Sequence, residues 1–255
     1  MGCFLAEGVK LVQDFLRGGL VCQGLLYTTP LVEAQLRTWL PKDSRFLLIP
    51  IEAKVMSRIS SLTTPCEVVG LFTLPLLQSP FSLPIGWGLV LDGVQNPGNL
   101  GSLIRSADWF GFRDIYCGPG TADAYSPKGV QATMGALARV RLGYGELGGL
   151  LTRAREEGLP VIGADLGGMN LQDLNHAIGQ VGNEGPSRGL VVMGNEGSGL
   201  SPLVKELLSH RVTIPLWHHA GEPSESLNVG AAASVFLWEL TRLRFARNEL
   251  PESKL

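Results

Sequence analysis

Short apolar runs alternate with helical segments along the last two thirds of the chain, and this alternation constrains the fold most strongly. The runs predict buried strands over Trp87–Leu91, Asp114–Cys117, Val140–Leu142, Val161–Ala164, Leu190–Met193 and Val212–Pro215. The segments between them predict helices near Asn99–Ala107, over Tyr125–Ala136 and Glu146–Glu157, and from Ser201 onward, while residues 165–189 predict a helical turn and a loop. Since helices that link consecutive strands make a parallel sheet, we expect an α/β domain that binds ligands at the carboxyl ends of its strands.

A smaller α/β layer structure is predicted for the first third of the chain. Its helices are expected over Gly8–Phe15, Leu31–Trp39 and Glu52–Ser60, and its strands over Val21–Tyr27, Phe46–Ile51 and Val68–Phe72. The stretch Leu74–Gly86 is rich in proline, which no regular element tolerates, so it predicts a linker. The expected organisation is a small domain over 1–75, a linker over 76–86 and a larger domain over 87–255.

Charge and cysteine content exclude several classes of protein. The 21 Lys and Arg against 23 Asp and Glu leave a net charge of −2, which gives no sign of broad nucleic-acid affinity but allows a local basic face. Residues before Gly86 carry a balance of +1, which fits an RNA-facing surface and an ordinary solvated one equally well. The four cysteines form no CxxC pair, so neither a metal site nor a disulfide framework is predicted, and a reducing, cytoplasmic compartment is expected. No signal peptide and no apolar run of about 18 residues is present, so no membrane association is expected.

The first polar motif follows the predicted strand at Trp87–Leu91. Asn96-Pro97-Gly98 predicts a turn, and the helix after it carries Asn99 and Arg105, with Ser102 midway between them. A helix N-terminus and a guanidinium can together bind a phosphate or a ribose. The alternative is that Asn99 only caps the helix and that Arg105 pairs with Asp92 or Asp108.

Two further motifs follow later strands. In GNEGSGL, Gly194–Leu200, three glycines surround Glu196, which lets the backbone approach a flat ligand and lets the carboxylate pair with a hydroxyl or a cation. The third motif, Ile214–Val229, is a polar loop before a helix that opens with the small residues 230–233 and that Ser224 or Ser226 can cap. Close helix packing explains those small residues as well as a bound ligand does. The glycine spacings match neither a dinucleotide-binding fingerprint nor a P-loop.

Taken in order, the motifs NPGNLGSLIRSADWFG, VVMGNEGSGLS and IPL…SESLNVGAAASV resemble the three signatures of the SpoU (TrmH-like) RNA 2′-O-ribose methyltransferases of the SPOUT superfamily. The resemblance extends from Gly86 to about Arg244. The first third, through EGVKLVQDFL, is similar to the small ribosomal-protein-like domain that binds substrate in many members. The resemblance implies a deep trefoil knot in the parallel-sheet domain, a homodimer, rRNA or tRNA as substrate, and S-adenosylmethionine as methyl donor.

The resemblance also implies which residues act. Five polar residues match the active-site positions of the family: Asn99, Arg105, Glu196, Ser226 and Asn228. The cofactor is expected among the backbone and apolar groups of Met193, Gly194, Asn195, Gly197, Ile214, Leu216, Leu227 and Asn228. Because a guanidinium stays protonated at any ordinary pH, we expect Arg105 to anchor a phosphate and stabilise charge, with the hydroxyl proton leaving to a phosphate or to water.

The sequence departs from the family pattern at two places. WHHAGEPSE lengthens the third motif and makes His218, His219 and Glu222 further candidates, and Gln131 stands where many relatives carry an arginine that contacts RNA phosphate. Two other functions stay open: methylation of a base by the same fold, and RNA binding without catalysis. The helix over Leu227–Arg244, with Phe236 and Trp238, is the expected dimer interface.

Overall fold

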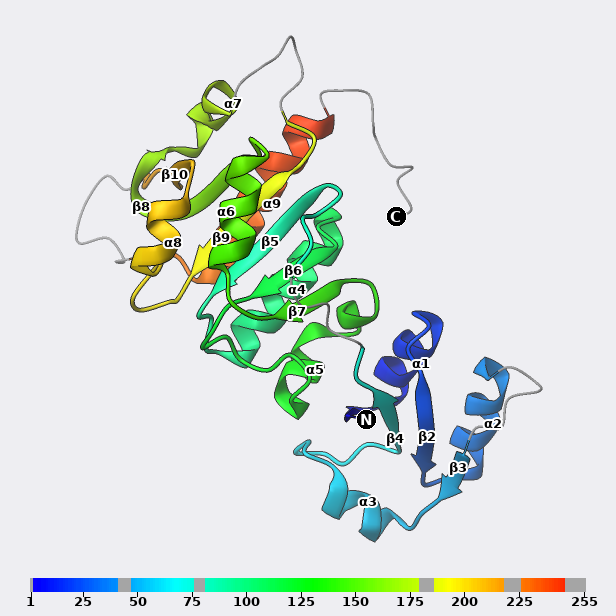
Figure 1. Ribbon diagram of the computed structural model, residues 1–255. Helices are drawn as coiled ribbons and strands as arrows, with labels where there is room; N and C mark the ends of the chain where they lie inside the picture. Colours follow the sequence, from blue (N-terminus) through cyan, green and yellow to red (C-terminus); the bar gives the residue numbers. More distant parts are fainter. Residues whose placement is uncertain (1, 41–46, 76–80, 179–185, 218–225, 246–255) are drawn as a thin grey trace. The chain divides into compact units, whose positions relative to one another are not determined.

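The computed structural model describes residues 2–40, 47–75, 81–178, 186–217 and 226–245 (Figure 1). The chain divides into two compact units, one formed by Met1–Leu76 with Asp123–Arg139, the other by Leu77–Ala122 with Val140–Leu255. The chain therefore passes from one unit to the other at three places. The sequence-based limits at residues 75 and 87 stay a prediction, and they gave no sign that residues 123–139 pack with the first unit.

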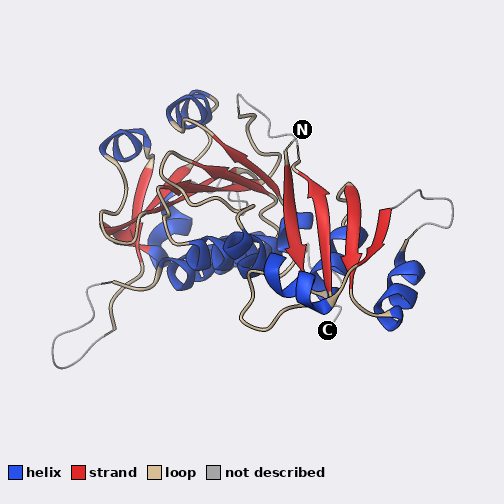
Figure 2. Ribbon diagram, turned by 90° about the horizontal axis from the view of Figure 1, so that it is seen from below, coloured by secondary structure: helices blue, strands red, loops and turns tan. Residues whose placement is uncertain are grey.

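The first unit is built on a four-stranded sheet with the order β1-β4-β2-β3. Figure 2 shows its strands side by side. The strands β2 and β3 are parallel, whereas β4 is antiparallel to both β1 and β2. The strand at Cys3–Glu7 was not predicted. The elements are β1 (Cys3–Glu7), α1 (Val9–Arg17), β2 (Cys22–Tyr27), α2 (Pro30–Trp39), β3 (Leu47–Pro50), α3 (Ala53–Ile59), β4 (Val68–Thr73), α5 (Pro127–Thr133) and the 3-10 helix η1 (Ala136–Ala138).

Aromatic packing and one amide explain why α5 belongs to the first unit. The rings of Phe4, Phe15 and Phe72 pack at centroid distances of 5.4–5.8 Å, and Tyr125, just before α5, lies 5.1 Å from Phe4. Gln131 on α5 donates from Nε2 to the Glu7 carbonyl oxygen at 2.9 Å, so it binds the edge strand β1. Gln131 is thus a structural contact in this chain.

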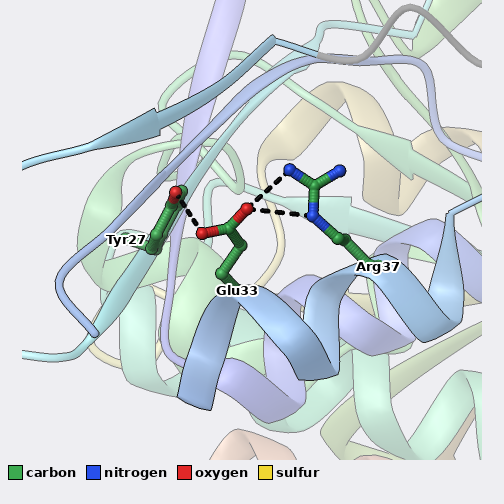
Figure 3. Close-up of polar contacts among 3 residues, drawn as sticks. All are labelled: Tyr27, Glu33 and Arg37. Atoms are coloured by element: carbon green, nitrogen blue, oxygen red, sulfur yellow. Dashed lines mark hydrogen bonds and ion pairs between the residues drawn. The ribbon is translucent and has the colours of Figure 1, made fainter. Parts of the chain in front are cut away.

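Helix α2 is fixed to strand β2 by a small polar cluster (Figure 3). Tyr27 donates from its hydroxyl to Glu33 Oε2 at 2.7 Å, and Arg37 donates from Nε to Glu33 Oε1 at 2.9 Å. The helix begins at Pro30, one residue before the predicted start at Leu31, because the Thr29 hydroxyl accepts from the backbone N–H of Val32 and Pro30 occupies the first turn.

The second unit confirms the predicted parallel sheet. Its six strands have the order β10-β8-β9-β5-β6-β7, and every pair is parallel. Strand β8 continues six residues beyond the predicted end at Ala164 and leads into η2 and α7, where the sequence predicted only a helical turn and a loop. The elements are β5 (Trp87–Asp92), α4 (Pro97–Phe110), β6 (Asp114–Cys117), β7 (Arg141–Tyr144), α6 (Gly148–Glu156), β8 (Val161–Asn170), η2 (Leu171–Asp173), α7 (Leu174–Ala177), β9 (Gly189–Gly194), α8 (Pro202–Leu207), β10 (His210–Thr213) and α9 (Val229–Phe245).

One face of this sheet is covered by α6 and α8, which enclose a buried apolar cluster with Val90 and Val192 (Figure 1). Phe81, from the predicted linker, is part of that cluster and only 7% exposed. Its ring meets Tyr116 edge-on at 5.1 Å, and the Tyr116 hydroxyl donates to the Ser82 carbonyl at 2.8 Å. The end of the predicted linker is therefore a structural part of the second unit.

The opposite face is covered by α4 and α9, which pack closely against each other (Figure 1). A Cβ added to Gly230 would lie 3.1 Å from the Cβ of Ser102, and the hydroxyls of Ser106 and Ser234 are hydrogen-bonded at 2.8 Å. The small residues at the start of α9 thus allow close helix packing, the alternative considered from the sequence. Among the described residues, no helix has the length and apolar character needed to cross a membrane.

Candidate active site

Asn96, not Asn99, caps the helix that carries the first motif. Its Oδ1 accepts from the backbone N–H groups of Gly98 at 2.8 Å and Asn99 at 3.2 Å, and Pro97 occupies the first turn of α4. The alternative in which Asn99 is the cap is therefore wrong, and its side chain is left for another role. The signal for this was the Asn-Pro pair itself, since asparagine before proline is a strong helix start.

Arg105 lies on the exposed side of α4, between the first and last turns of the helix. Within the part of the chain that the structure describes, its guanidinium has no hydrogen bond or ion pair. The Asp92 carboxylate, one of the two partners considered for it, accepts instead from the Ser201 backbone N–H at 2.6 Å. An exposed arginine without a protein partner is available to a phosphate.

The second motif is a tight loop at the carboxyl end of β9. Asn195 Oδ1 accepts from the backbone N–H groups of Gly197 and Ser198, at 2.8 and 3.0 Å, and Asn195 Nδ2 donates to the Gly93 carbonyl at 2.8 Å. Asn195 therefore uses its side chain to join this loop to the one after β5, and only its backbone remains for a ligand. The role of Gly93 in this tie was missed from the sequence, although an Asp-Gly pair at a strand end signals a special turn; its φ is +73°.

Asn228 ends the third motif and caps α9. Its Oδ1 accepts from the backbone N–H of Gly230 at 3.0 Å and of Ala231 at 3.4 Å. The cap is thus Asn228 and not Ser226, which lies two residues earlier and is exposed. Ser224, the other predicted cap, lies outside the described residues, as do His218, His219 and Glu222.

Hydrogen bonds join the three motifs into one network. Asn228 Nδ2 donates to Asn99 Oδ1 at 2.9 Å, and Asn99 Nδ2 donates to Glu196 Oε1 at 2.7 Å. Asn99 is about a hundred or more positions away from each of its two partners in the chain, so only the fold brings them together. Three of the five predicted catalytic residues are in direct contact, whereas no hydrogen bond of the described residues joins Arg105 to them.

The predicted cofactor residues differ in what they can offer a ligand. Leu216 and Leu227 are 68% and 55% exposed, so both present apolar surface, and Ile214 is half-buried. Met193 is only 2% exposed, so its side chain belongs to the core. Gly194 approaches its own loop so closely that an added Cβ would lie 2.5 Å from the Gly199 carbonyl carbon. Apolar side chains beside backbone groups fit a planar base with a polar edge.

The chain belongs to the SpoU rRNA Methylase family, which residues 87–238 match. Residues 1–70 match the MRM3-like substrate binding domain. The 23S rRNA (guanosine(2553)-2′-O)-methyltransferase RlmP of Bacillus subtilis is 28% identical over 238 residues, which cover 93% of this chain and 88% of RlmP.

Solved structures agree with this assignment. A protein of the TrmH family from Porphyromonas gingivalis is 37% identical, with a TM-score of 0.79 over 94% of this chain and 90% of that one. The SpoU methyltransferase AviRb from Streptomyces viridochromogenes, solved in complex with the cofactor AdoMet, is 26% identical, with a TM-score of 0.78 over 96% of this chain and 91% of AviRb.

Proposed function

We propose that this protein transfers a methyl group from S-adenosylmethionine to a ribose 2′-hydroxyl of RNA, most simply ribosomal RNA in the cytoplasm. The observation that carries the proposal is the network in which Asn228, Asn99 and Glu196 bring one residue of each motif into contact. Family membership and the rRNA substrates of relatives such as RlmP support the same reaction.

The residues of the site fit the cofactor. The backbone of the loop 194–199 and the exposed side chains of Leu216 and Leu227 would hold the adenosine, with Ile214 beside them. The bound cofactor supplies an electrophilic methyl group on a sulfonium. The protein then has to place the ribose oxygen in line with that methyl group and receive the hydroxyl proton.

Arg105 is proposed as the phosphate anchor of this site. Its fork of donors suits a phosphate oxygen pair, which a lysine cannot reproduce. We expect Arg105→Lys to lower kcat/KM for RNA by tenfold or more, with cofactor affinity measured by calorimetry unchanged. Unchanged turnover of Arg105→Lys would remove Arg105 from this role.

A trefoil knot is part of the proposal. Support for it comes from the ties between the end of β9 and the end of β5, through Asn195 to Gly93 and Ser201 to Asp92. After β10 the chain returns to place α9 against α4. Ser226 is proposed to line the same site because it precedes Asn228 by two residues.

We also propose a homodimer that uses the outer faces of α4 and α9. Trp109, Val235 and Trp238 are 80%, 39% and 51% exposed on these helices, whereas Phe236, which the sequence suggested for the interface, is 1% exposed and packs inside. We expect the protein to be a dimer by light scattering at micromolar concentration and Trp238→Arg to be a monomer. A monomeric wild-type protein would contradict the interface.

The deciding experiment is methyl transfer from labelled S-adenosylmethionine to total rRNA and, separately, tRNA from cells that lack the protein. We expect a 2′-O-methyl nucleoside in the digest. Label on a base would support the base-methylating alternative. Cofactor binding without transfer to either RNA, including assembled ribosomal particles, would count against the proposed reaction, and RNA binding without cofactor binding would favour the non-catalytic alternative.

A further inference from the structure

The hydrogen bonds of the network have a fixed direction. The backbone N–H groups of Gly230 and Ala231 can only donate, so the atom of Asn228 that faces them must be its oxygen. The amide nitrogen of Asn228 therefore faces Asn99, and Asn99 must present its oxygen there. The nitrogen of Asn99 is then left to face Glu196, and the carboxylate accepts from it. The N-terminus of α9 thus sets the orientation of both amides.

This direction decides what Glu196 can do. Asn99 holds Oε1 at 2.7 Å, and no other residue that the structure describes donates to the carboxylate. The side chain is exposed on the glycine-rich loop after β9, where it would otherwise sample several rotamers. The network therefore fixes one oxygen and leaves the second as an aimed acceptor beside the loop expected to hold the methyl donor.

Resting on the proposed function, we propose that Glu196 is the group that takes the proton of the ribose 2′-hydroxyl, and that Asn99 and Asn228 are positioning residues that aim it. The ribose oxygen forms its bond to the methyl carbon as the carbon–sulfur bond breaks. The hydroxyl proton passes to Oε2 of Glu196, which becomes a neutral carboxylic acid and later releases the proton to water. The positive charge of the sulfonium and the negative charge of the carboxylate are lost together, so charge balances. Neither a phosphate nor water is then needed as the first proton acceptor, and Arg105 keeps its role as an anchor.

Asn228→Asp separates positioning from helix capping. Aspartate caps a helix as well as asparagine does, so the fold is retained. The new carboxylate at position 228 has no donor for Asn99, however. The Asn99 amide therefore turns over to donate to that carboxylate and shows its oxygen to Glu196, which repels it. We expect kcat to fall by about 30-fold or more, less than the roughly 100-fold minimum for losing a general acid or base, because the carboxylate is misaimed and not removed. Cofactor affinity should stay within about threefold of wild type.

Asn96→Asp is the matched control, because it makes the same change at the cap of α4, outside the network. Its kcat at saturating RNA should stay within threefold of wild type. The ligand-free proteins give a second readout: the side-chain amide NMR signals of Asn99 should shift in Asn228→Asp and not in Asn96→Asp. Full activity of Asn228→Asp, or an unmoved Asn99 signal, would overturn the positioning role.

A pair of glutamine variants tests the proton transfer. In Glu196→Gln, Asn99 still needs an acceptor, so the new glutamine turns its amide nitrogen outward and offers a donor to the hydroxyl. In the double variant Asn99→Asp with Glu196→Gln, the carboxylate introduced at position 99 accepts from both Asn228 and the new glutamine. The carbonyl of that glutamine then points outward again. It can accept a hydrogen bond but cannot take a proton.

We therefore expect both glutamine variants to be about 100-fold or more slower than wild type, a loss in the range of a missing general base. Recovery of the double variant to within tenfold of wild type would overturn the proton transfer and leave Glu196 as a hydrogen-bond acceptor. The wild-type protein is assayed first: if it transfers no methyl group, the proposed function fails, whereas wild-type activity with an active Asn228→Asp refutes the positioning role alone.

Discussion

Glu7, at the end of β1, offers the sharpest test of how the first unit is held together. The residue is 4% exposed, and its carboxylate accepts from the hydroxyl of Ser60 at 2.6 Å, the hydroxyl of Ser61 at 2.5 Å and the backbone N–H of Ser61 at 3.0 Å. These bonds fasten the chain after α3 to the edge of the sheet. In Glu7→Gln the charge is lost and one acceptor oxygen becomes a donor. The Ser61 N–H cannot accept from it, and a serine hydroxyl can accept only by turning its own hydrogen away.

The expected loss of unfolding free energy follows from the number of hydrogen bonds lost. A hydrogen bond to a charged group contributes about 1.5–3 kcal/mol, and a buried donor left without a partner costs about 1–3 kcal/mol. Glutamine keeps one acceptor oxygen, so we expect the free energy of unfolding to fall by about 2–4 kcal/mol. For a chain of 255 residues 1 kcal/mol shifts Tm by about 2–4 °C, so the melting temperature should drop by roughly 4–16 °C.

The pH dependence of the unfolding free energy provides a second test of this prediction. Burial raises the pKa of Glu7, but the hydrogen bonds from Ser60 and Ser61 outweigh it, so the pKa in the folded protein lies below the ordinary value of 4.5. A lowered folded pKa means that the stabilisation is present above pH 4.5 and is lost as pH falls through the folded value. The difference in unfolding free energy between wild type and Glu7→Gln should therefore be full near pH 7 and shrink below about pH 4.5.

Calorimetry at pH 7 and urea unfolding across the range from about pH 3 to about pH 7 would measure both effects. Glu33→Gln is the matched control, since Glu33 also accepts from a hydroxyl and a further donor but lies at the surface (Figure 3). Its Tm should change by less than half as much, because solvent replaces the lost bonds. Equal effects of the two variants, or a Glu7→Gln difference that does not vary with pH, would refute the argument that burial makes the Glu7 bonds strong.

Two further substitutions test the second unit. Gly194→Ala would place a Cβ 2.5 Å from the Gly199 carbonyl carbon, so the loop that carries Glu196 must move. We expect a loss of about 1–3 kcal/mol in unfolding free energy together with a large loss of methyl transfer. Gly149→Ala, in helix α6, meets nothing within 4 Å and should not lower Tm, since alanine is the better helix former. Phe81→Ala should lower the unfolding free energy by about 3–5 kcal/mol, whereas Ile85→Ala, 82% exposed, should have little effect; similar Tm values for these two would mean that residue 81 is only linker.

The parallel sheet could be predicted because its strands carry continuous apolar runs with turn residues at their ends. The buried pattern of β5 and β9 follows directly from WGLVLD and GLVVMG. The strand Cys3–Glu7 was missed, because five residues at the start of a chain give too short a pattern and the strand pairs only with β4, far along the sequence. The packing of α5 with the first unit was missed for a similar reason: it depends on Tyr125 and Gln131 meeting Phe4 and Glu7.

At the site, the sequence could indicate which polar residues matter but not how they are used. The motifs singled out Asn99, Glu196 and Asn228 together with Asn195, as if all four faced a ligand. In the structure the Asn195 amide is consumed by backbone groups of its own loop and of Gly93, and Asn228 has a second task as a helix cap. Spacing along a chain contains no information about which end of an amide faces which neighbour.

That information arises only when helix ends and loops are brought together in the fold. The backbone N–H groups at the start of α9 fix the amide of Asn228 in the third motif. Asn228 fixes the amide of Asn99 in the first motif, and Asn99 holds the carboxylate of Glu196 in the second motif. The close packing of α4 on α9 at Ser102 and Gly230 keeps the two amides within hydrogen-bonding distance. A larger residue at position 230 should therefore disturb the aim of Glu196, because its Cβ would lie 3.1 Å from the Ser102 Cβ and 3.2 Å from Asn228 Oδ1. The small residues that looked like a ligand surface in the sequence thus act on the site through helix packing.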